Sequence, residues 1–358
     1  MGKDNPLPTR MSIPDSTTPL ANETADVVKA SIVIPMKNPG PVFRQVLAAV
    51  CKQQTSFAYD VLVVDSGSTD GSVEFVQTFG DPRVRLIQIK PTEFGHGKTR
   101  NLAVANTTGE YAVVITHDAL PVDEHWLQAM VQTADADPRI AGVFGRHIAY
   151  PSASPYTRRD LEAHFANFAP EPVVELTDRA RYDQDESYRQ RLHFFSDNNA
   201  LLRRSVWQMH PYPDVDFAED QIWAKHIVEA GWKKAYSADG AVYHSHDYAL
   251  IEKLQRSFDE SYALYRLFGY VLSRSITHML KSWVAHTMND LRYARRTGMH
   301  RTHLSLVLKT PLDNLARALG HYLGSRADKL PQKLRHWLSR DRRLLLGLPM
   351  SNSGGKPS

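Results

Sequence analysis

Cysteine is nearly absent from this chain of 358 residues, which contains only Cys51. A single cysteine excludes an internal disulfide framework and a zinc site built from several thiolates. Because Cys51 lies in the apolar run 43–51, we interpret it as a core residue rather than as a reactive thiol.

Long hydrophobic runs are absent as well. No stretch approaches about 18 uninterrupted apolar residues, so no membrane-spanning helix is expected. Lys3, Asp4 and several prolines occupy the N-terminus, where a signal peptide would have its apolar segment. We therefore expect a cytoplasmic protein, either free or peripheral at the inner face of the plasma membrane.

Neither sign of charge is in large excess. The net charge of +4 and the pI near 9.0 favour an anionic ligand or surface without requiring nucleic acid. Basic residues are spread along the chain and no recognised nucleic-acid-binding motif occurs, so no nucleic-acid partner is expected. The G-x-G-x-x-G fingerprint is also missing, which argues against a dinucleotide site.

Short apolar strands alternate with amphipathic helices once the first 29 residues are passed. Residues 1–29 are rich in Pro, Ser, Thr and Asn and are predicted to be a flexible tail. The apolar runs predict buried strands at residues 30–35, 59–64, 84–89 and 111–115. A strand, a helix and a second strand at this spacing form a βαβ unit with a right-handed crossover, so the fold class is α/β with a mostly parallel sheet.

Acidic side chains follow two of these strands. Asp65 opens the loop 65–71 after the second strand, and Asp118 follows the fourth. Ligands of open α/β sheets bind outside the carboxyl ends of the strands. Asp65 is therefore a candidate for binding a nucleoside, and Asp118 for holding a metal-bound phosphate. The alternatives are an ordinary Asx/Gly turn and a cap on the following helix.

A glycine-rich basic segment, residues 93–101, follows the third strand. If a helix begins near Gly97, His96 and Arg100 lie one turn apart and can point at one anion. An arginine fork beside a helix N-terminus is a suitable environment for a diphosphate. A solvated basic helix start is the alternative.

The following half of the chain contains two clusters of polar side chains. Residues 151–192 are predicted to be a flexible cover with a helix around 160–168, or a surface helix and loop. The residues Asp197, Asn198 and Asn199 are candidates for bonding sugar hydroxyls, or form a turn. The pair Glu219-Asp220 opens a helix that includes Trp223, where acidic side chains also favour the helix dipole.

Two histidines, His244 and His246, share a face if the chain there is extended. Either could complete a metal shell, and we favour His244. A structural histidine pair is the alternative, and a zinc site is not expected because cysteines and a helical H-E-x-x-H motif are missing.

Residues 251–345 are predicted to be helical and residues 346–358 disordered. Towards the end of this region, basic residues alternate with apolar ones, a pattern typical of helices on anionic membranes. Packing on the catalytic domain or a homodimer interface explains the pattern equally well. The residues are Arg326, Lys329, Lys333, Arg335, Arg340, Arg342 and Arg343, with Leu330, Leu334, Trp337, Leu338 and residues 344–346.

Together these motifs resemble the family-2 inverting glycosyltransferases of the GT-A fold. The match runs from Ser31-Ile32-Val33-Ile34-Pro35 through the loop 65–71 to Thr116-His117-Asp118, and the resemblance covers roughly residues 30–250. The segment Phe94-Gly95-His96-Gly97-Lys98-Thr99-Arg100-Asn101 resembles the rhamnosyltransferases of polysaccharide assembly.

The resemblance implies a GT-A domain over residues 30–250, with a nucleotide-sugar half (30–120) and an acceptor half (121–250), followed by a C-terminal helical extension. It implies that Asp118 is the last carboxylate of the D-x-D metal motif, whose first position is Thr116 here, and that Mg²⁺ or Mn²⁺ is the cofactor. Asp220 would be the general base, and Glu219 would orient it or the acceptor. The metal site would comprise Asp118 and His244.

The remaining expected site residues fall into two groups. Nucleotide-sugar binding is expected of Pro35, Asp65, Ser68, His96, Lys98, Arg100, Asn101 and His117, the last as a supporting residue rather than a metal ligand. Acceptor binding is expected of Asp197, Asn198, Asn199 and Trp223.

The expected reaction is transfer of L-rhamnose from dTDP-rhamnose to a hydroxyl of a bacterial surface glycan of the O-antigen or capsule type. The acceptor would be a glycan or a lipid-linked glycan, with peripheral membrane contact through the basic C-terminal helices. The alternatives are a UDP- or GDP-sugar donor, and a non-enzymatic nucleotide-sugar-binding subunit of an assembly complex.

Overall fold

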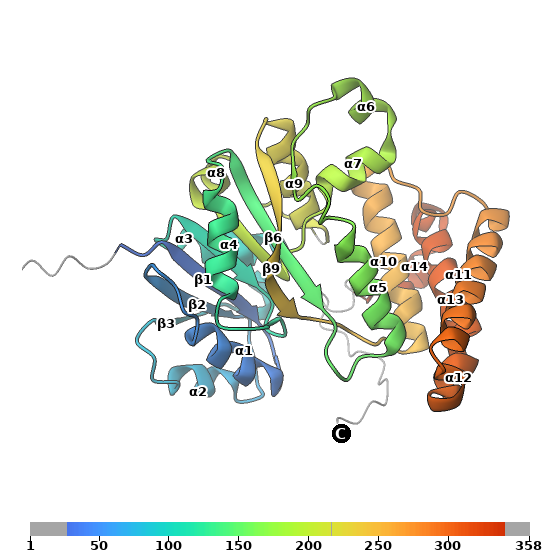
Figure 1. Ribbon diagram of the computed structural model, residues 1–358, viewed down its shortest axis with the longest axis horizontal. Coiled ribbons are helices and arrows are strands. Elements are labelled where there is room, and N and C mark those ends of the chain that lie inside the picture. Colours follow the sequence, from blue (N-terminus) through green and yellow to red (C-terminus); the bar gives the residue numbers. More distant parts are fainter. Residues whose placement is uncertain (1–26, 216, 341–358) are drawn as a thin grey trace, which may run out of the picture.

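The computed structural model describes residues 27–215 and 217–340 (Figure 1). The predicted disordered tail at 346–358 lies outside these residues, as does nearly all of the predicted N-terminal tail at 1–29.

A single mixed sheet forms the centre of the described chain. Its strand order is β3-β2-β1-β4-β8-β6-β9-β5, with β7 paired to β9. The first four strands in this order are parallel neighbours, as predicted. They are β1 (Ala30–Met36), β2 (Tyr59–Asp65), β3 (Val84–Gln88) and β4 (Tyr111–Ile115).

Beyond β4 the sheet is mixed. Strand β8 (Asn199–Arg203) is antiparallel to both β4 and β6 (Ile140–Ile148), and β9 (Lys233–Tyr243) is parallel to β6. Two short strands, β5 (Leu120–Pro121) and β7 (Val173–Val174), pair antiparallel with β9. The result is a mostly parallel α/β sheet of the predicted class.

Helices cover both faces of the sheet, which is why its inner strands are continuous apolar runs. Neighbouring residues of β1 divide between the faces: Ile32 and Ile34 belong to one core and Val33 to the other. The first core also contains residues of α1 (Val42–Cys51), α2 (Ser72–Gln77) and α4 (Trp126–Asp135). The second contains residues of α3 (His96–Ala105), α8 (Arg204–Met209) and α9 (Glu219–Glu229).

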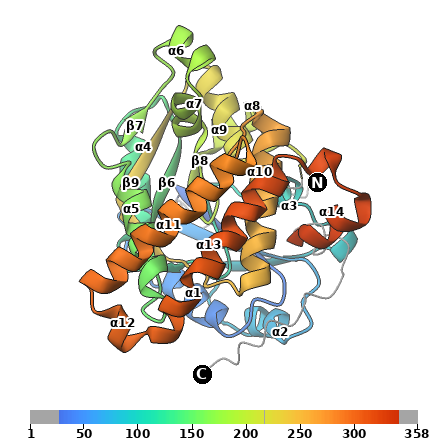
Figure 2. The ribbon, with the colours of Figure 1, turned by 90° about the vertical axis from the view of Figure 1, so that its right-hand side faces the viewer.

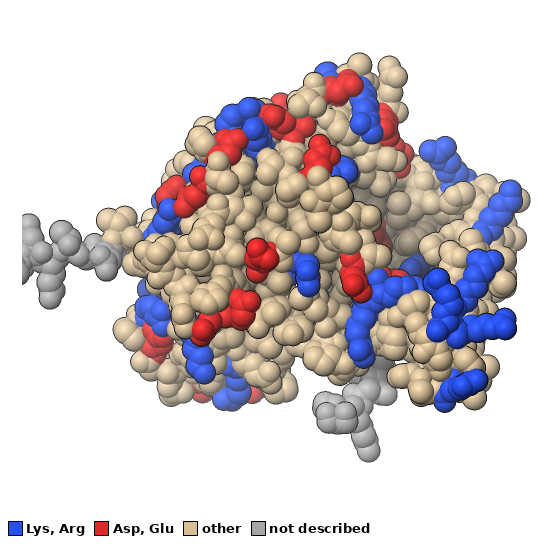
Figure 3. All heavy atoms as spheres, viewed as in Figure 1, with Lys and Arg blue, Asp and Glu red and all other residues tan. Residues whose placement is uncertain are grey.

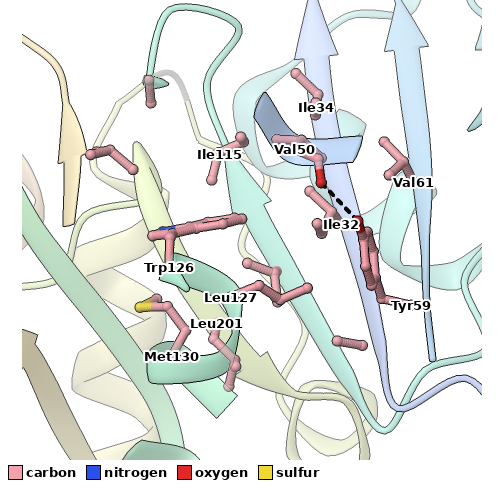
Figure 4. Packing of buried hydrophobic residues seen from close by; sticks show 14 of the residues in the cluster. Ile32, Ile34, Val50, Tyr59, Val61, Ile115, Trp126, Leu127, Met130 and Leu201 are labelled. Carbon is pink, nitrogen blue, oxygen red and sulfur yellow. Dashed lines mark hydrogen bonds between the residues drawn. The ribbon is translucent and has the colours of Figure 1, made fainter. Parts of the chain in front are cut away.

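Figure 4 shows the first core, where Trp126 of α4 lies towards Ile115 and Met130 lies beside Leu201. The Tyr59 hydroxyl donates a hydrogen bond to the Val50 carbonyl at 3.0 Å and ties β2 to α1. Cys51 packs half-buried against this core, and burial raises the pKa of its thiol to about 12. Its predicted role as a core residue is confirmed.

The segment predicted as a cover folds into regular elements. It contains α5 (Pro155–Ala166), α6 (Arg179–Gln184) and α7 (Glu186–His193). Helix α5 corresponds to the predicted helix at 160–168, shifted towards the N-terminus because Pro155 and the capping Ser154 start it early. A short 3₁₀ helix, η1 (Pro91–Glu93), precedes α3.

The C-terminal region is helical, as predicted, and forms a layer beside the sheet domain (Figure 2). Its elements are α10 (Leu250–Phe268), α11 (Ile276–Arg296), α12 (Met299–Thr302), α13 (Leu304–Gly324), η2 (Ala327–Lys329) and α14 (Gln332–Leu338). Helices α10 and α13 approach closely: a Cβ on Gly320 would lie 2.5 Å from the Leu254 carbonyl oxygen.

The basic segment that begins at Arg326 packs on the protein where it is described. Leu330 and Leu338 join the core of α10 and α13, and Arg326 donates hydrogen bonds to the carbonyls of Ser273 and Arg274. Residues 326–340 therefore pack on the helices of the C-terminal layer, whereas Arg342, Arg343 and residues 344–346 lie outside the described residues. Among the helices of residues 27–215 and 217–340, none is both long enough and apolar enough to cross a bilayer.

Candidate active site

A cavity of about 380 Å³ lies at the carboxyl ends of β1, β2 and β4. Pro35, Ser66 and Thr116 line it from these strands and the residues that follow them. The opposite wall includes Asp197 and Asp220. The topology therefore brings the loops that follow β1, β2 and β4 together with a distant part of the chain. Asp197, for example, is more than 80 residues beyond Thr116 in the sequence.

The Asp65 carboxylate organises the loop after β2. Asp65 is 1% exposed, and its carboxylate accepts hydrogen bonds from the backbone N–H groups of Gly67 and Ser68. The Ser68 hydroxyl accepts a bond from the Asn38 N–H at 2.8 Å and so ties this loop to the one after β1. Asp65 and Ser68 are thus bonded within and between these two loops, and the neighbouring Ser66 lines the cavity.

Helix α3 presents only part of the predicted anion site to the cavity. His96 lines it, whereas Lys98 is exposed to solvent. The Asn101 amide donates to the Tyr212 carbonyl at 2.8 Å and accepts from the Trp207 indole and the Tyr212 N–H. Asn101, which was expected to bind the nucleotide sugar, therefore ties α3 to the segment at Tyr212.

Arg100 carries a buried positive charge between two carboxylates. Its guanidinium bonds to Glu219, and its Nε lies 3.1 Å from an oxygen of Asp197. Burial works to lower the pKa of Arg100, but Glu219 and Asp197 outweigh it and raise the pKa above its usual range. The charge expected to meet a diphosphate is thus compensated within the protein.

Asp197 belongs to the same network. Burial raises its pKa to about 6 against the opposing effect of Arg100, and Glu219 adds to the rise. The Tyr212 hydroxyl donates to Asp197 at 2.6 Å. This carboxyl is 2% exposed, which leaves it little access to a ligand even though it borders the cavity.

Asp220 is the acidic group of this cluster without a bonded cation. It lies half-buried in the cavity wall, where its carboxylate accepts from the Asp197 N–H at 3.2 Å. Burial raises the pKa of Asp220 well above its ordinary value, and the charges of Glu219 and Asp197 raise it further. The preceding Ala218 has a left-handed backbone with φ of 59°, an uncommon conformation for alanine that turns the chain into α9.

Asp118 meets two histidines from a distant part of the chain. Its oxygens lie 3.6 Å from His244 Nε2 and 3.2 Å from His246 Nε2. One potential ligand atom from each residue lies within 4.8 Å of the others, which is the spacing of a cation site. Both histidines reach Asp118 because they are two residues apart beyond β9, as predicted. The alternative that Asp118 caps a helix is not realised, since α4 begins at Trp126.

The protonation states of Asp118 and His244 suit a divalent cation. Burial would raise the pKa of Asp118, but the hydrogen bond from His246 and the nearby His244 and His117 hold it below its usual range. Burial lowers the pKa of His244 to about 4, so its imidazole is neutral at pH 7. An ionised carboxylate and a neutral imidazole are the forms that bind metals.

Two buried polar atoms near this triad have no hydrogen-bond partner. One is the Thr116 hydroxyl, at the first position of the expected metal motif, and the other is His147 Nε2. Thr116 and His117 line the cavity, and the His147 ring centre lies 5.3 Å from that of His244. Buried polar groups are normally bonded, so an unpartnered hydroxyl in a cavity wall indicates room for a polar ligand.

The predicted acceptor residues divide into exposed and buried ones. Asn198 lines the cavity. Asn199 and Trp223 are fully buried, and each bonds inside the protein: Asn199 accepts from the Trp126 indole, and the Trp223 indole donates to the His210 carbonyl. Contrary to expectation, neither side chain is accessible to an acceptor.

A second, larger cavity of about 780 Å³ lies between α5, α10, α11 and α13. It includes His246, and Arg256 of α10 lines both cavities. Charged and amide side chains of the helical region, among them Lys253 and Asn314, line its walls. No sequence pattern indicated this cavity, because its lining comes from helices whose packing is set by tertiary contacts.

A mostly parallel α/β sheet with a cavity outside the carboxyl ends of its strands is the arrangement expected of a GT-A domain. The family model described as "Glycosyl transferase family 2" matches residues 31–209. The chain belongs to this family.

Two relatives extend the similarity across most of the chain. The O-antigen chain rhamnosyltransferase RfbN of Salmonella typhimurium is 29% identical, covering 85% of this chain and 92% of the relative. The O-antigen chain rhamnosyltransferase WbaN of Salmonella anatum is 26% identical, covering 84% of this chain and 90% of the relative.

A solved structure shows the same fold. The mannosyltransferase of Pyrobaculum calidifontis, in complex with GDP-Man and Mn²⁺, has a TM-score of 0.55 and 17% identity. The alignment covers 84% of this chain and 88% of that one. The family model and the two rhamnosyltransferase relatives show that the chain is a glycosyltransferase, so the non-enzymatic alternative is discarded.

Proposed function

We propose that this glycosyltransferase moves L-rhamnose from dTDP-rhamnose to a hydroxyl of a growing bacterial surface glycan, on the cytoplasmic side of the membrane. The observation that carries the proposal is the similarity to two O-antigen rhamnosyltransferases over 85% and 84% of the chain. Both relatives match the C-terminal helical region as well as the GT-A domain, since a match to residues 30–250 alone would cover much less. The donor half is residues 30–120, and the acceptor half is residues 121–250.

Asp220 is the proposed general base. It takes the proton from the acceptor hydroxyl while that oxygen attacks C1 of the donor sugar and the bond from C1 to the diphosphate oxygen breaks. Both Glu219 and Asp220 line the cavity. Two features support this role for Asp220: it is the more exposed of the two, and Glu219 is paired with Arg100. A carboxylate with a raised pKa is a stronger base near neutral pH than an ordinary one.

The donor would lie in the cavity of about 380 Å³. Pro35 and Ser66 would border the nucleoside, while His96 and His117 would meet the diphosphate or the sugar. The unpartnered Thr116 hydroxyl can donate to an oxygen of this ligand. Asp65, Ser68, Arg100 and Asn101 would act indirectly, by holding the walls of the cavity in place.

Asp118, His244 and His246 would hold the divalent cation. One carboxylate oxygen and two imidazole nitrogens suit Mn²⁺ better than Mg²⁺, which prefers oxygen ligands. When bound, the cation supplies positive charge that stabilises the departing diphosphate. His147 would orient His244 through ring contact.

The larger cavity of about 780 Å³ would take the acceptor glycan. It reaches the metal triad at His246 and the donor cavity at Arg256. Its walls offer hydrogen-bond donors and acceptors in close pairs, such as Lys253 and Asp313 at 2.8 Å, which match vicinal sugar hydroxyls. This assignment replaces Asn199 and Trp223 as acceptor contacts.

A donor screen tests the proposal. The protein is titrated by calorimetry with dTDP-rhamnose, UDP-glucose and GDP-mannose, each with Mn²⁺ or Mg²⁺, and nucleotide release is followed by mass spectrometry. The expected result is that dTDP-rhamnose binds at least about tenfold more tightly than the other donors, a difference of roughly 1.4 kcal/mol. Tighter binding of a UDP- or GDP-sugar would overturn the choice of donor while leaving the family assignment intact.

A further inference from the structure

Two helices of the C-terminal layer expose regular stripes of large apolar side chains. On α11 the stripe is Ile276, Leu280, Val284 and Met288, and on α13 it is Leu304, Leu308 and Leu312. These side chains are between 43% and 68% exposed. Residues four apart lie on one face of a helix, so each stripe forms a continuous band. Isolated exposed apolar residues are ordinary, but a band on two adjacent helices marks an interaction site.

The two bands lie on the same outer side of the molecule. Helices α11 and α13 pack side by side and run in opposite directions (Figure 2), and the Trp283 indole donates to the Pro311 carbonyl at 2.8 Å. Leu280 lies three residues before Trp283, and Val284 lies one residue after it. Leu308 and Leu312 have the same offsets from Pro311. In two antiparallel helices, residues with the same offsets from the point of contact project to the same side of the helix pair. The bands therefore form one apolar surface.

Positive charge surrounds this apolar surface. Residues 274–312 contain seven Lys and Arg residues and a single acidic residue, Asp290. Asp290 faces inwards, where it accepts from Arg159 and Asn314. Figure 3 shows Lys and Arg along the edge of the molecule formed by these helices, with no Asp or Glu visible there on this face. The basic residues are Arg274, Lys281, Arg292, Arg295, Arg296, Arg301 and Lys309, all exposed.

We propose that this surface of α11 and α13 docks on an anionic lipid bilayer, with the apolar bands in the acyl-headgroup boundary and the basic residues on lipid phosphates. A band of Leu, Ile, Val and Met flanked by Lys and Arg is the arrangement that interfacial helices use. The surface differs from the basic tail indicated by the sequence, because residues 326–340 pack on α10.

A second copy of this chain fits the surface less well. A twofold contact would bring the same patch of both copies together, and with it fourteen like charges from two sets of seven. An anionic bilayer offers both an apolar layer and compensating charge. Charge complementarity therefore favours lipid over self-association.

The position of the surface agrees with a membrane-bound acceptor, a point that rests on the proposed function. A cavity of about 560 Å³ is lined by Arg159, Tyr293, Arg295 and Arg296, next to the apolar surface. The proposed acceptor cavity shares Arg159, His286 and Asp290 with it and continues to His246 at the metal triad. A glycan linked to a membrane lipid could therefore reach the site from the bilayer edge.

Vesicle co-sedimentation tests the proposal with the full chain. Vesicles of phosphatidylcholine with phosphatidylglycerol are compared with vesicles of phosphatidylcholine alone. Binding is expected to the anionic vesicles and to weaken in high salt. One variant carries Leu280→Gln, Val284→Gln and Met288→Gln, and a second carries Lys281→Gln, Arg295→Gln and Arg296→Gln. The charge variant is expected to bind about a hundredfold more weakly, since each basic residue near an anionic surface contributes about a factor of five.

A matched control removes three exposed lysines elsewhere, Lys52→Gln, Lys90→Gln and Lys333→Gln. It should bind like the unmodified protein, and all variants should keep the melting temperature and the affinity for dTDP-rhamnose. Equal loss in the control, or unchanged binding in both α11 variants, would overturn the proposal. The proposal would also be overturned if the protein did not bind vesicles but self-associated, and if the α11 variants abolished that self-association. If the unmodified protein did not bind dTDP-rhamnose, that result would contradict the proposed function and not the docking surface.

Discussion

Arg100 lies buried between Glu219 and Asp197, which are about a hundred residues further along the chain. The sequence correctly indicated a cation at the start of a helix, but not which anion it would meet. A buried charge needs a partner within the protein, and here two carboxylates supply it. The polar amide of Asn101 likewise finds its hydrogen-bond partners within the protein, at Tyr212.

Replacement of Arg100 should destabilise the fold. Arg100→Met leaves two buried carboxylates without their cation, and the expected loss in the free energy of unfolding is about 3–5 kcal/mol. Lys98→Met, on the same helix but exposed, is the control and should change it by less than about 0.5 kcal/mol. Urea denaturation of both variants measures the difference, and equal stability of the two would contradict the buried network.

Replacement of Asp220 should stop transfer without affecting donor binding. Asp220→Asn keeps the shape of the side chain but cannot accept the hydroxyl proton, so kcat should fall by about 10²- to 10⁴-fold. Calorimetry should give an unchanged Kd for the donor. The exposed Asp239→Asn is the control and should retain full turnover. A kcat for Asp220→Asn near that of the control would exclude Asp220 as the base.

The pH dependence of the rate should report the raised pKa of Asp220. The base acts in its deprotonated form, so the rate should fall as the pH drops through this raised value. An ordinary aspartate would lose its charge only near pH 3.9, so the decline should begin at a clearly higher pH. The profile of kcat/KM measures it, and a flat profile down to pH 5 would contradict the assignment.

At the scale of elements, the local patterns predicted the secondary structure closely. Strand β4 occupies the expected residues 111–115, and α9 begins at Glu219, as the acidic pair indicated. Apolar periodicity and capping residues act within a few positions, so a single sequence contains this information. The contact of α10 with α13 was not predictable, because it depends on small residues whose partners are about 60 residues away.

The close contact of α10 and α13 gives an unusual prediction for Gly320. Glycine to alanine within a helix normally stabilises by about 1 kcal/mol. Here the new Cβ would lie 2.5 Å from the Leu254 carbonyl oxygen, so Gly320→Ala should instead destabilise by about 1–3 kcal/mol. Ser305→Ala, exposed on the same helix, is the control and should be neutral or slightly stabilising. Thermal unfolding decides the sign, and a more stable Gly320→Ala would show that the helices can separate without cost.

At the scale of the whole molecule, the C-terminal helices complete the site instead of forming a separate appendage. Arg256 of α10 lines the donor cavity and lies with its guanidinium carbon 4.8 Å from the centre of the Phe217 ring. The sequence division at residue 250 coincides with the start of α10 at Leu250, but the function of the two parts cannot be separated there.

The proposed metal triad also depends on the whole fold, because β4 and β9 bring Asp118 and the two histidines together. Asp118→Ala should lower the Mn²⁺-dependent part of donor affinity by at least about tenfold to a hundredfold. Addition of a chelator should weaken donor binding by the unmodified protein but not by this variant. Asp123→Ala, exposed in the following loop, serves as the control. Equal titrations of the unmodified protein with and without chelator would count against the triad.

The sequence by itself determined the α/β class, the succession of strands and helices along the chain, and the motifs at Asp118 and Glu219-Asp220. Each of these depends on neighbours along the chain. Only the tertiary structure decided that Arg100 pairs with carboxylates, that Asn199 and Trp223 are interior, and that α11 and α13 expose an apolar surface. These outcomes depend on which distant segments meet in space, and the free energy of such meetings is a property of the packed molecule rather than of any local pattern.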